Sequence, residues 1–115
     1  FTTMLYGGLV AGHKAGLIYN TFPLMEGQWF PREAFFYQPI WVNFFKNAAL
    51  VQWCHRVLAI SSWVGVLILY AGTYKKGREC SSIFFWLIST TIQVGLGIIT
   101  LLYQVPVLAG VLHQG

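Results

Sequence analysis

An apolar run from Ala48 to Tyr74 constrains the fold of this chain more than any other feature. A helix needs about 20 apolar residues to cross a bilayer, so the run predicts a membrane-spanning helix. Near its start the run carries two ionisable residues, His55 and Arg56. Ionisable residues are costly at membrane depth, and they indicate a functional site that faces a bundle interior, a ligand or a partner.

The composition is that of a membrane protein. Hydrophobic residues make up 57% of the chain and charged residues only 9%, whereas soluble domains carry about 25% charged residues. Of the seven Lys and Arg residues, Lys75, Lys76 and Arg78 lie in one short loop. That clustering predicts a loop in the cytoplasm or the mitochondrial matrix, and no nucleic-acid partner.

The apolar pattern predicts an all-α, multi-pass helical bundle with about three transmembrane helices and the start of a fourth. The expected helices are Phe1 to about Tyr19, Ala48–Tyr74, Ser82 to about Tyr103, and Val107–Gly115. Residues 20–47 contain three prolines and many aromatic residues, so we expect a loop on the membrane interface, with a short helix opening at Pro31. Because the last segment stops part-way through a bilayer, we expect a fragment truncated at both ends.

Two cysteines and several glycines add smaller constraints. Cys54 and Cys80 are expected about 30–40 Å apart along one helix, too far for a disulfide. Gly8, Gly12 and Gly16 recur every four residues, and a ridge of small residues lets helices approach closely. Gly95 and Gly97 indicate close approach of a neighbouring helix or a flat ligand.

Two histidines are predicted to lie at the same depth. His55 follows Ala48 by seven residues, and His113 follows Pro106 by seven. Both helices enter from the same side, so both imidazoles lie roughly 10 Å below one surface. This arrangement suits axial ligation of a haem iron between helices. Arg56 is a candidate partner for a haem propionate.

Other interpretations of the histidines stay open at this point. Each can be a hydrogen-bonded structural residue, or the pair can bind zinc or copper. A proton relay is disfavoured, because no Asp or Glu lies in any apolar segment. Cys54 points about 100° away from His55 around the helix, and we do not expect it to be a ligand.

Four stretches together resemble the haem A synthase (CtaA/Cox15) family. They are VAGHKAGLIYNTFPLM (10–25), VQWCHR (51–56), QVGLG with TLL (93–97 and 100–102), and HQ (113–114). Their order and spacing match the family over nearly the whole chain. Neither His13, which stands where a variable residue is expected, nor Lys14 is given a role.

The resemblance implies half of an eight-helix membrane protein built from two similar four-helix halves. That enzyme oxidises the C8 methyl group of haem O to a formyl group, which gives haem A for cytochrome c oxidase. Residues 1–115 correspond to most of the C-terminal half, which holds a haem b with His55 and His113 as its axial ligands. The substrate haem lies in the other half, so residues 1–115 alone are expected to be inactive.

The resemblance also bears on location and partners. It implies a bacterial plasma membrane or a mitochondrial inner membrane, with haem O, haem A and membrane lipid as partners. A haem O synthase, an electron donor and a second copy of the chain remain open as further partners. A b-type cytochrome subunit that only transfers electrons is the alternative function, and a haem-free transporter or scaffold subunit is the third.

Overall fold

The computed structural model describes residues 1–75 and 81–114 of the chain. These residues form helices and no β-strand. The elements are α1 (Thr2–Gly12), η1 (Ala15–Leu17), η2 (Ile40–Val42), α2 (Asn43–Lys46), α3 (Ala48–Lys75), α4 (Ser81–Leu102) and α5 (Val107–Gln114), where η denotes a 3-10 helix. The expected all-α class is therefore confirmed.

Helices α3 and α4 have the length and composition of membrane spans. They contain 28 and 22 residues, and both are apolar enough to cross a membrane. Their boundaries agree with the expected ones to within one residue. Large side chains such as Ile68, Phe85 and Trp86 are exposed on their surfaces. A soluble domain would bury most such groups, so these surfaces are suited to lipid or to further helices.

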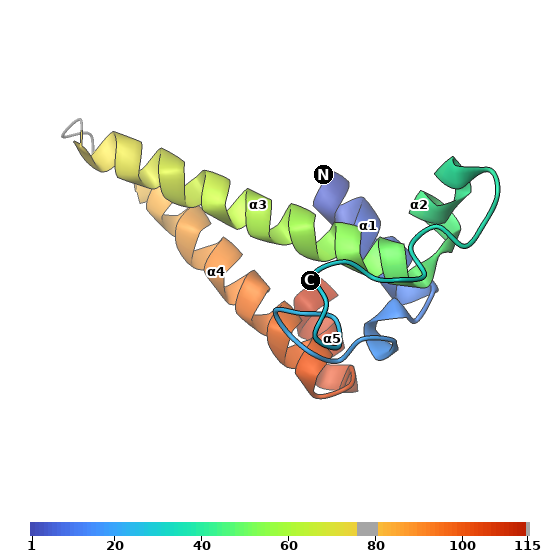
Figure 1. The fold of residues 1–115 in the computed structure, drawn as a ribbon. Helices are drawn as coiled ribbons and strands as arrows, with labels where there is room; N and C mark the ends of the chain where they lie inside the picture. The colour runs from blue at the N-terminus through green and yellow to red at the C-terminus, as the bar shows by residue number, and fades with distance from the viewer. Residues whose placement is uncertain (76–80, 115) are drawn as a thin grey trace.

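Figure 1 shows the arrangement of the helices. Helices α3 and α4 run antiparallel, lie close together near Lys75 and Ser81, and diverge toward their other ends. At that wider end α1 packs against α3, and α5 packs against α4. Residues 76–79 of the expected basic loop and Cys80 lie outside the described residues, so the topology and the absence of a disulfide stay predictions.

Helix α1 ends earlier than the sequence predicts, at Gly12 and not near Tyr19. Lys14 has a φ of +51°, and this left-handed conformation stops the helix. Side chains then bind backbone groups that a continuing helix would not reach. His13 Nε2 hydrogen-bonds the Phe45 carbonyl oxygen at 2.7 Å, and Asn20 Nδ2 donates to the Leu101 carbonyl oxygen at 2.9 Å.

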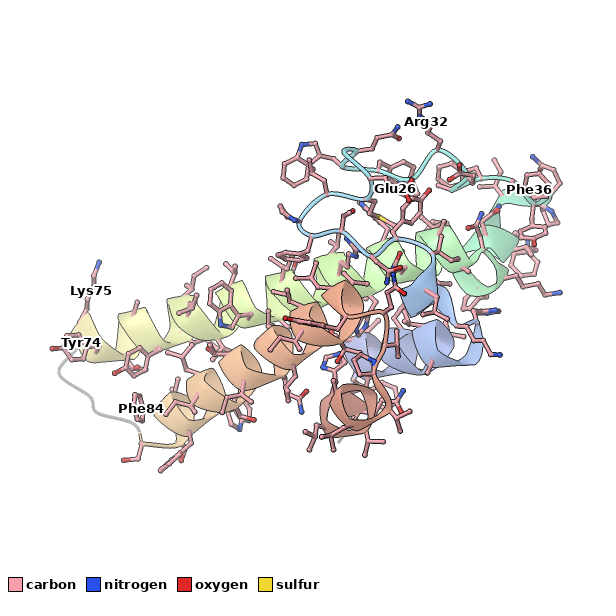
Figure 2. The ribbon with its side chains drawn as sticks, turned by 90° about the horizontal axis from the view of Figure 1, so that it is seen from below. Glu26, Arg32, Phe36, Tyr74, Lys75 and Phe84 are labelled. Carbon is pink, nitrogen blue, oxygen red and sulfur yellow. The ribbon has the colours of Figure 1, made fainter. Side chains whose placement is uncertain are left out.

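The long loop lies along one side of α3, with Arg32 and Phe36 at its outer edge (Figure 2). The expected helix at Pro31 is wrong: that stretch forms only a turn, closed by a bond of 3.3 Å from the Ala34 N–H to the Pro31 carbonyl. The short helices η2 and α2 come later, between Ile40 and Lys46. The placement of the loop on the membrane interface stays a prediction.

The most fully buried side chains gather where this loop meets the start of α3. They include Leu50 and Val51 from α3, Asn43 from α2, and Met25 and Pro31 from the loop. Asn47 caps α3, because its Oδ1 accepts from the N–H groups of Ala49 at 3.0 Å and Leu50 at 3.2 Å. Its Nδ2 donates to the carbonyl oxygen of Glu33. One amide thus fixes both the first turn of α3 and the loop above it.

A second contact closes the loop on itself. The Tyr19 hydroxyl donates to Glu33 Oε2 at 2.6 Å. This hydrogen bond raises the pKa of Tyr19 from 10.0 to about 12, and it holds the pKa of Glu33 below its usual 4.5. The contact therefore stabilises the loop at pH values between the lowered pKa of Glu33 and the raised pKa of Tyr19. It is lost as pH rises through about 12 and as pH falls through the lowered pKa of Glu33.

We predict that Asn47→Ala lowers the free energy of unfolding by about 1–2 kcal/mol, because a helix cap is lost. Denaturant unfolding in detergent micelles measures the change. Asn47→Ser is the matched control, since serine retains a cap acceptor but loses the amide that binds Glu33. Equal stability of the alanine variant and the unmodified protein would contradict the assignment of this cap.

We predict that Glu33→Gln returns the pKa of Tyr19 toward 10.0, because the ionised acceptor is removed. The tyrosinate absorbance is titrated against pH, and subtraction of the Tyr19→Phe variant isolates the signal of this residue. Glu26→Gln is the control and should shift the titration less, since Glu26 acts only through its charge. Ionisation of Tyr19 near pH 10 in the unmodified protein would rule out the contact.

Candidate functional site

The structure brings His55 of α3 and His113 of α5 together. Their ring centroids are 6.2 Å apart and their ring planes are inclined by 77°. Both side chains are partly buried. The two residues are 58 positions apart in the chain, and they meet at the wider end of the α3–α4 pair, where α1 packs against α3 and α5 packs against α4. Their role as ligands stays a prediction.

The imidazole of His55 is held by helix α1. Its Nδ1 lies 3.1 Å from the carbonyl oxygen of Thr3. A carbonyl can only accept, so Nδ1 carries the hydrogen and Nε2 is left with its lone pair. A Cβ built on Gly7 would lie 3.3 Å from Cε1 of the same ring. The ring thus rests on one turn of α1, with the nitrogen suited to metal binding unprotonated.

The imidazole of His113 lies against helix α4 in a comparable way. A Cβ built on Gly97 would lie 2.8 Å from its Cε1 and 3.1 Å from its Nε2. These distances leave no room for a side chain at position 97. Nδ1 of His113 is buried and has no hydrogen-bond partner among the described residues.

Arg56 reaches the backbone of the loop. Its Nη1 donates to the Thr21 carbonyl oxygen at 2.9 Å, and its Nη2 donates to the Tyr19 carbonyl oxygen at 2.8 Å. Gln52 Nε2 donates to the same Tyr19 oxygen at 3.0 Å. Nε of Arg56 is buried and has no partner among the described residues. Arg56 therefore holds the loop on α3, and its contact with a propionate stays a prediction.

The separation of the two rings suits a metal placed between them. Histidine nitrogens bind metals at about 2 Å. Each ring centroid lies about 1 Å further away, so two imidazoles on opposite sides of one metal have centroids about 6 Å apart. Within residues 1–75 and 81–114, no three His, Cys, Asp or Glu side chains gather as a metal site. Two imidazoles on opposite sides of one iron would suit a haem, whose porphyrin supplies the remaining ligands.

The sequence reasoning missed the partners of the two rings. It named Gly97 for close approach, but it did not name Thr3 or Gly7, and it did not pair any glycine with a histidine. The sequence holds a partial signal for one of them. Gly7 follows Thr3 by four residues, and residues four apart share one helix face. This spacing does not show which neighbour that face contacts, because the contact depends on how the helix is rotated about its axis.

Three curated relatives illustrate the similarity of this chain to known proteins. The chain is 45% identical over 111 residues to the "Heme A synthase" of Wolbachia pipientis wMel, covering 96% of this chain and 31% of that protein. It is 41% identical over 113 residues to the "Heme A synthase" of Bartonella bacilliformis, and the match covers 96% of this chain and 32% of that protein. It is 43% identical over 114 residues to the "Heme A synthase" of Rhizobium meliloti, and the match covers 95% of this chain and 30% of that protein. The chain spans about a third of the length of these relatives.

No solved structure matches the chain. A family model matches residues 1–115, from one end of the chain to the other, and its description is "Cytochrome oxidase assembly protein". This match agrees with the two apolar spans, α3 and α4, of an integral membrane protein. The chain belongs to the COX15-CtaA family of cytochrome oxidase assembly proteins.

Proposed function

We propose that residues 1–115 form the haem b-binding half of a haem A synthase. The parent protein oxidises the C8 methyl group of haem O to a formyl group, and the product is haem A for cytochrome c oxidase. Relatives at 41–45% identity that carry the name "Heme A synthase" support this proposal. Because the chain spans about a third of those relatives, the activity belongs to the parent protein and not to this part alone.

The meeting of His55 and His113 is the observation on which the proposal rests. Their centroid separation of 6.2 Å fits two axial ligands on one iron. The inclination of 77° between the rings is compatible with this role, because each ring can turn about its own bond to the metal. The two residues come from different helices and far-apart segments, so the fold itself creates the pair.

The surrounding residues prepare the histidines for this role. The Thr3 carbonyl fixes the protonated nitrogen of His55 and aims the ring, as partners of metal-binding histidines commonly do. The exposed apolar surfaces of α3 and α4 support a location of the pair within the low-dielectric layer of a membrane. Haem b held here would supply one-electron transfer, at a potential set partly by its two imidazole ligands.

We predict that His55→Ala and His113→Ala each reduce the haem b bound per protein by roughly tenfold or more. A lost coordinate bond worth over 1.4 kcal/mol costs at least tenfold in affinity. The measurement is a reduced-minus-oxidised spectrum of the purified parent protein, with haem extracted and quantified. His13→Ala is the control. That imidazole follows the C-terminal end of α1 and binds the carbonyl of Phe45 in α2, whereas the hydrogen bond of α1 with His55 lies near the N-terminal end of α1. An unchanged low-spin band in either variant would refute the ligand assignment.

We predict that the parent protein converts haem O to haem A in a host that lacks its own synthase. Extracted haems are separated by chromatography and compared with an empty-vector strain. The His55→Ala and His113→Ala variants should yield little haem A, and residues 1–115 alone should yield none. A protein that binds haem b but forms no haem A would instead be a cytochrome that only transfers electrons.

A further inference from the structure

The glycines of this chain differ sharply in what they face. Of the helical glycines, Gly7 and Gly97 lie against an imidazole, one against each member of the histidine pair. A Cβ built on Gly8, Gly12 or Gly95 would meet nothing within 4 Å. The contact is therefore specific to two positions, and it does not follow from a general abundance of glycine.

Both glycines lie beside the Cε1 atom of a histidine. In α1, Gly7 lies beside Cε1 of His55, and the carbonyl of Thr3, one helical turn earlier, binds Nδ1 of the same ring at 3.1 Å. In α4, Gly97 lies beside Cε1, Nε2 and Nδ1 of His113, and this Nδ1 has no hydrogen-bond partner among the described residues. The two helix pairs thus share the glycine contact, and the α1 pair adds a hydrogen bond.

We propose that Gly7 and Gly97 are positioning residues that set the orientation of the two axial imidazoles. We call the contact of each glycine with its imidazole an imidazole seat: Gly7 with His55, and Gly97 with His113. A seat lets the Cε1 edge of the ring approach the backbone of the neighbouring helix, which limits the orientations that the ring can adopt. This inference rests on the proposed function, because the orientation matters only if the pair binds a metal.

The two seats differ in how much space they leave. At Gly97 a Cβ would lie 2.8 Å from Cε1 of His113, a distance at which the ring must move. At Gly7 the corresponding distance to Cε1 of His55 is 3.3 Å, which a small shift relieves. Alanine should therefore disturb the site more at position 97 than at position 7.

The test compares Gly97→Ala with Gly95→Ala, and Gly7→Ala with Gly8→Ala, in the full-length protein. Each control adds the same methyl group to the same helix, at a position where it meets nothing. The readouts are the low-spin haem b band, the reduction potential and carbon monoxide binding by the ferrous haem. A haem with two imidazole ligands has no free position for carbon monoxide.

We expect Gly97→Ala to retain haem b but to bind carbon monoxide several-fold more than the unmodified protein, with a weaker low-spin band. Gly7→Ala should show a smaller change, and both controls should match the unmodified protein. If Gly97→Ala has the same band, potential and carbon monoxide binding as Gly95→Ala, the inference is overturned while the proposed function stands. Absence of low-spin haem b from the unmodified protein would instead overturn both.

A second comparison decides the matter if Gly97→Ala yields no haem. Exogenous imidazole is titrated into His113→Gly and into His113→Gly combined with Gly97→Ala. If Gly97 orients the ring, imidazole should restore the low-spin band in His113→Gly. It should bind several-fold more weakly to the protein that also carries Gly97→Ala. Equal imidazole affinity in the two proteins would overturn the inference.

Discussion

The carbonyl oxygen of Tyr19 accepts hydrogen bonds from two side chains of α3, Gln52 at 3.0 Å and Arg56 at 2.8 Å. The chain has left its helix at this point, so its backbone groups need other partners, and an unpaired carbonyl in an apolar bundle costs several kcal/mol. Asn20 extends the junction by donating to the Leu101 carbonyl at the end of α4, at 2.9 Å. Through these bonds residues 19 and 20 link α3 to α4 at the end where the two helices lie far apart. The two histidines meet at this end.

The fold could be predicted where it depends on local apolar pattern. The bounds of α3 and α4 follow from the length of each apolar run, because a continuous helix satisfies the backbone hydrogen bonds of a segment in lipid. The end of α1 could not be predicted in this way. It depends on the left-handed Lys14 and on the bond from His13 to Phe45, a residue more than 30 positions later. Contacts of this kind exist only after the loop has folded.

The candidate site, too, could be predicted only where it depends on spacing along the sequence. Equal spacing from the helix starts was enough to predict that His55 and His113 lie at one depth. Which glycines serve them was not predictable, because this depends on how each helix is rotated about its axis. A ridge of glycines spaced by four includes Gly8 and Gly12, yet it is Gly7, one position away, that faces His55. Arg56 likewise contacts the loop backbone, which its charge alone would not indicate.

The orientation of each histidine is therefore set by a helix that does not carry it. His55 belongs to α3 but rests on α1, and His113 belongs to α5 but rests on α4. A metal held between the rings would connect all four helices through two coordinate bonds. The junction at Tyr19 and Asn20 joins α3, which carries His55, to the end of α4, on which His113 rests. No loop side chain is an expected ligand, yet the loop backbone is bonded to the helix that carries one of the two histidines.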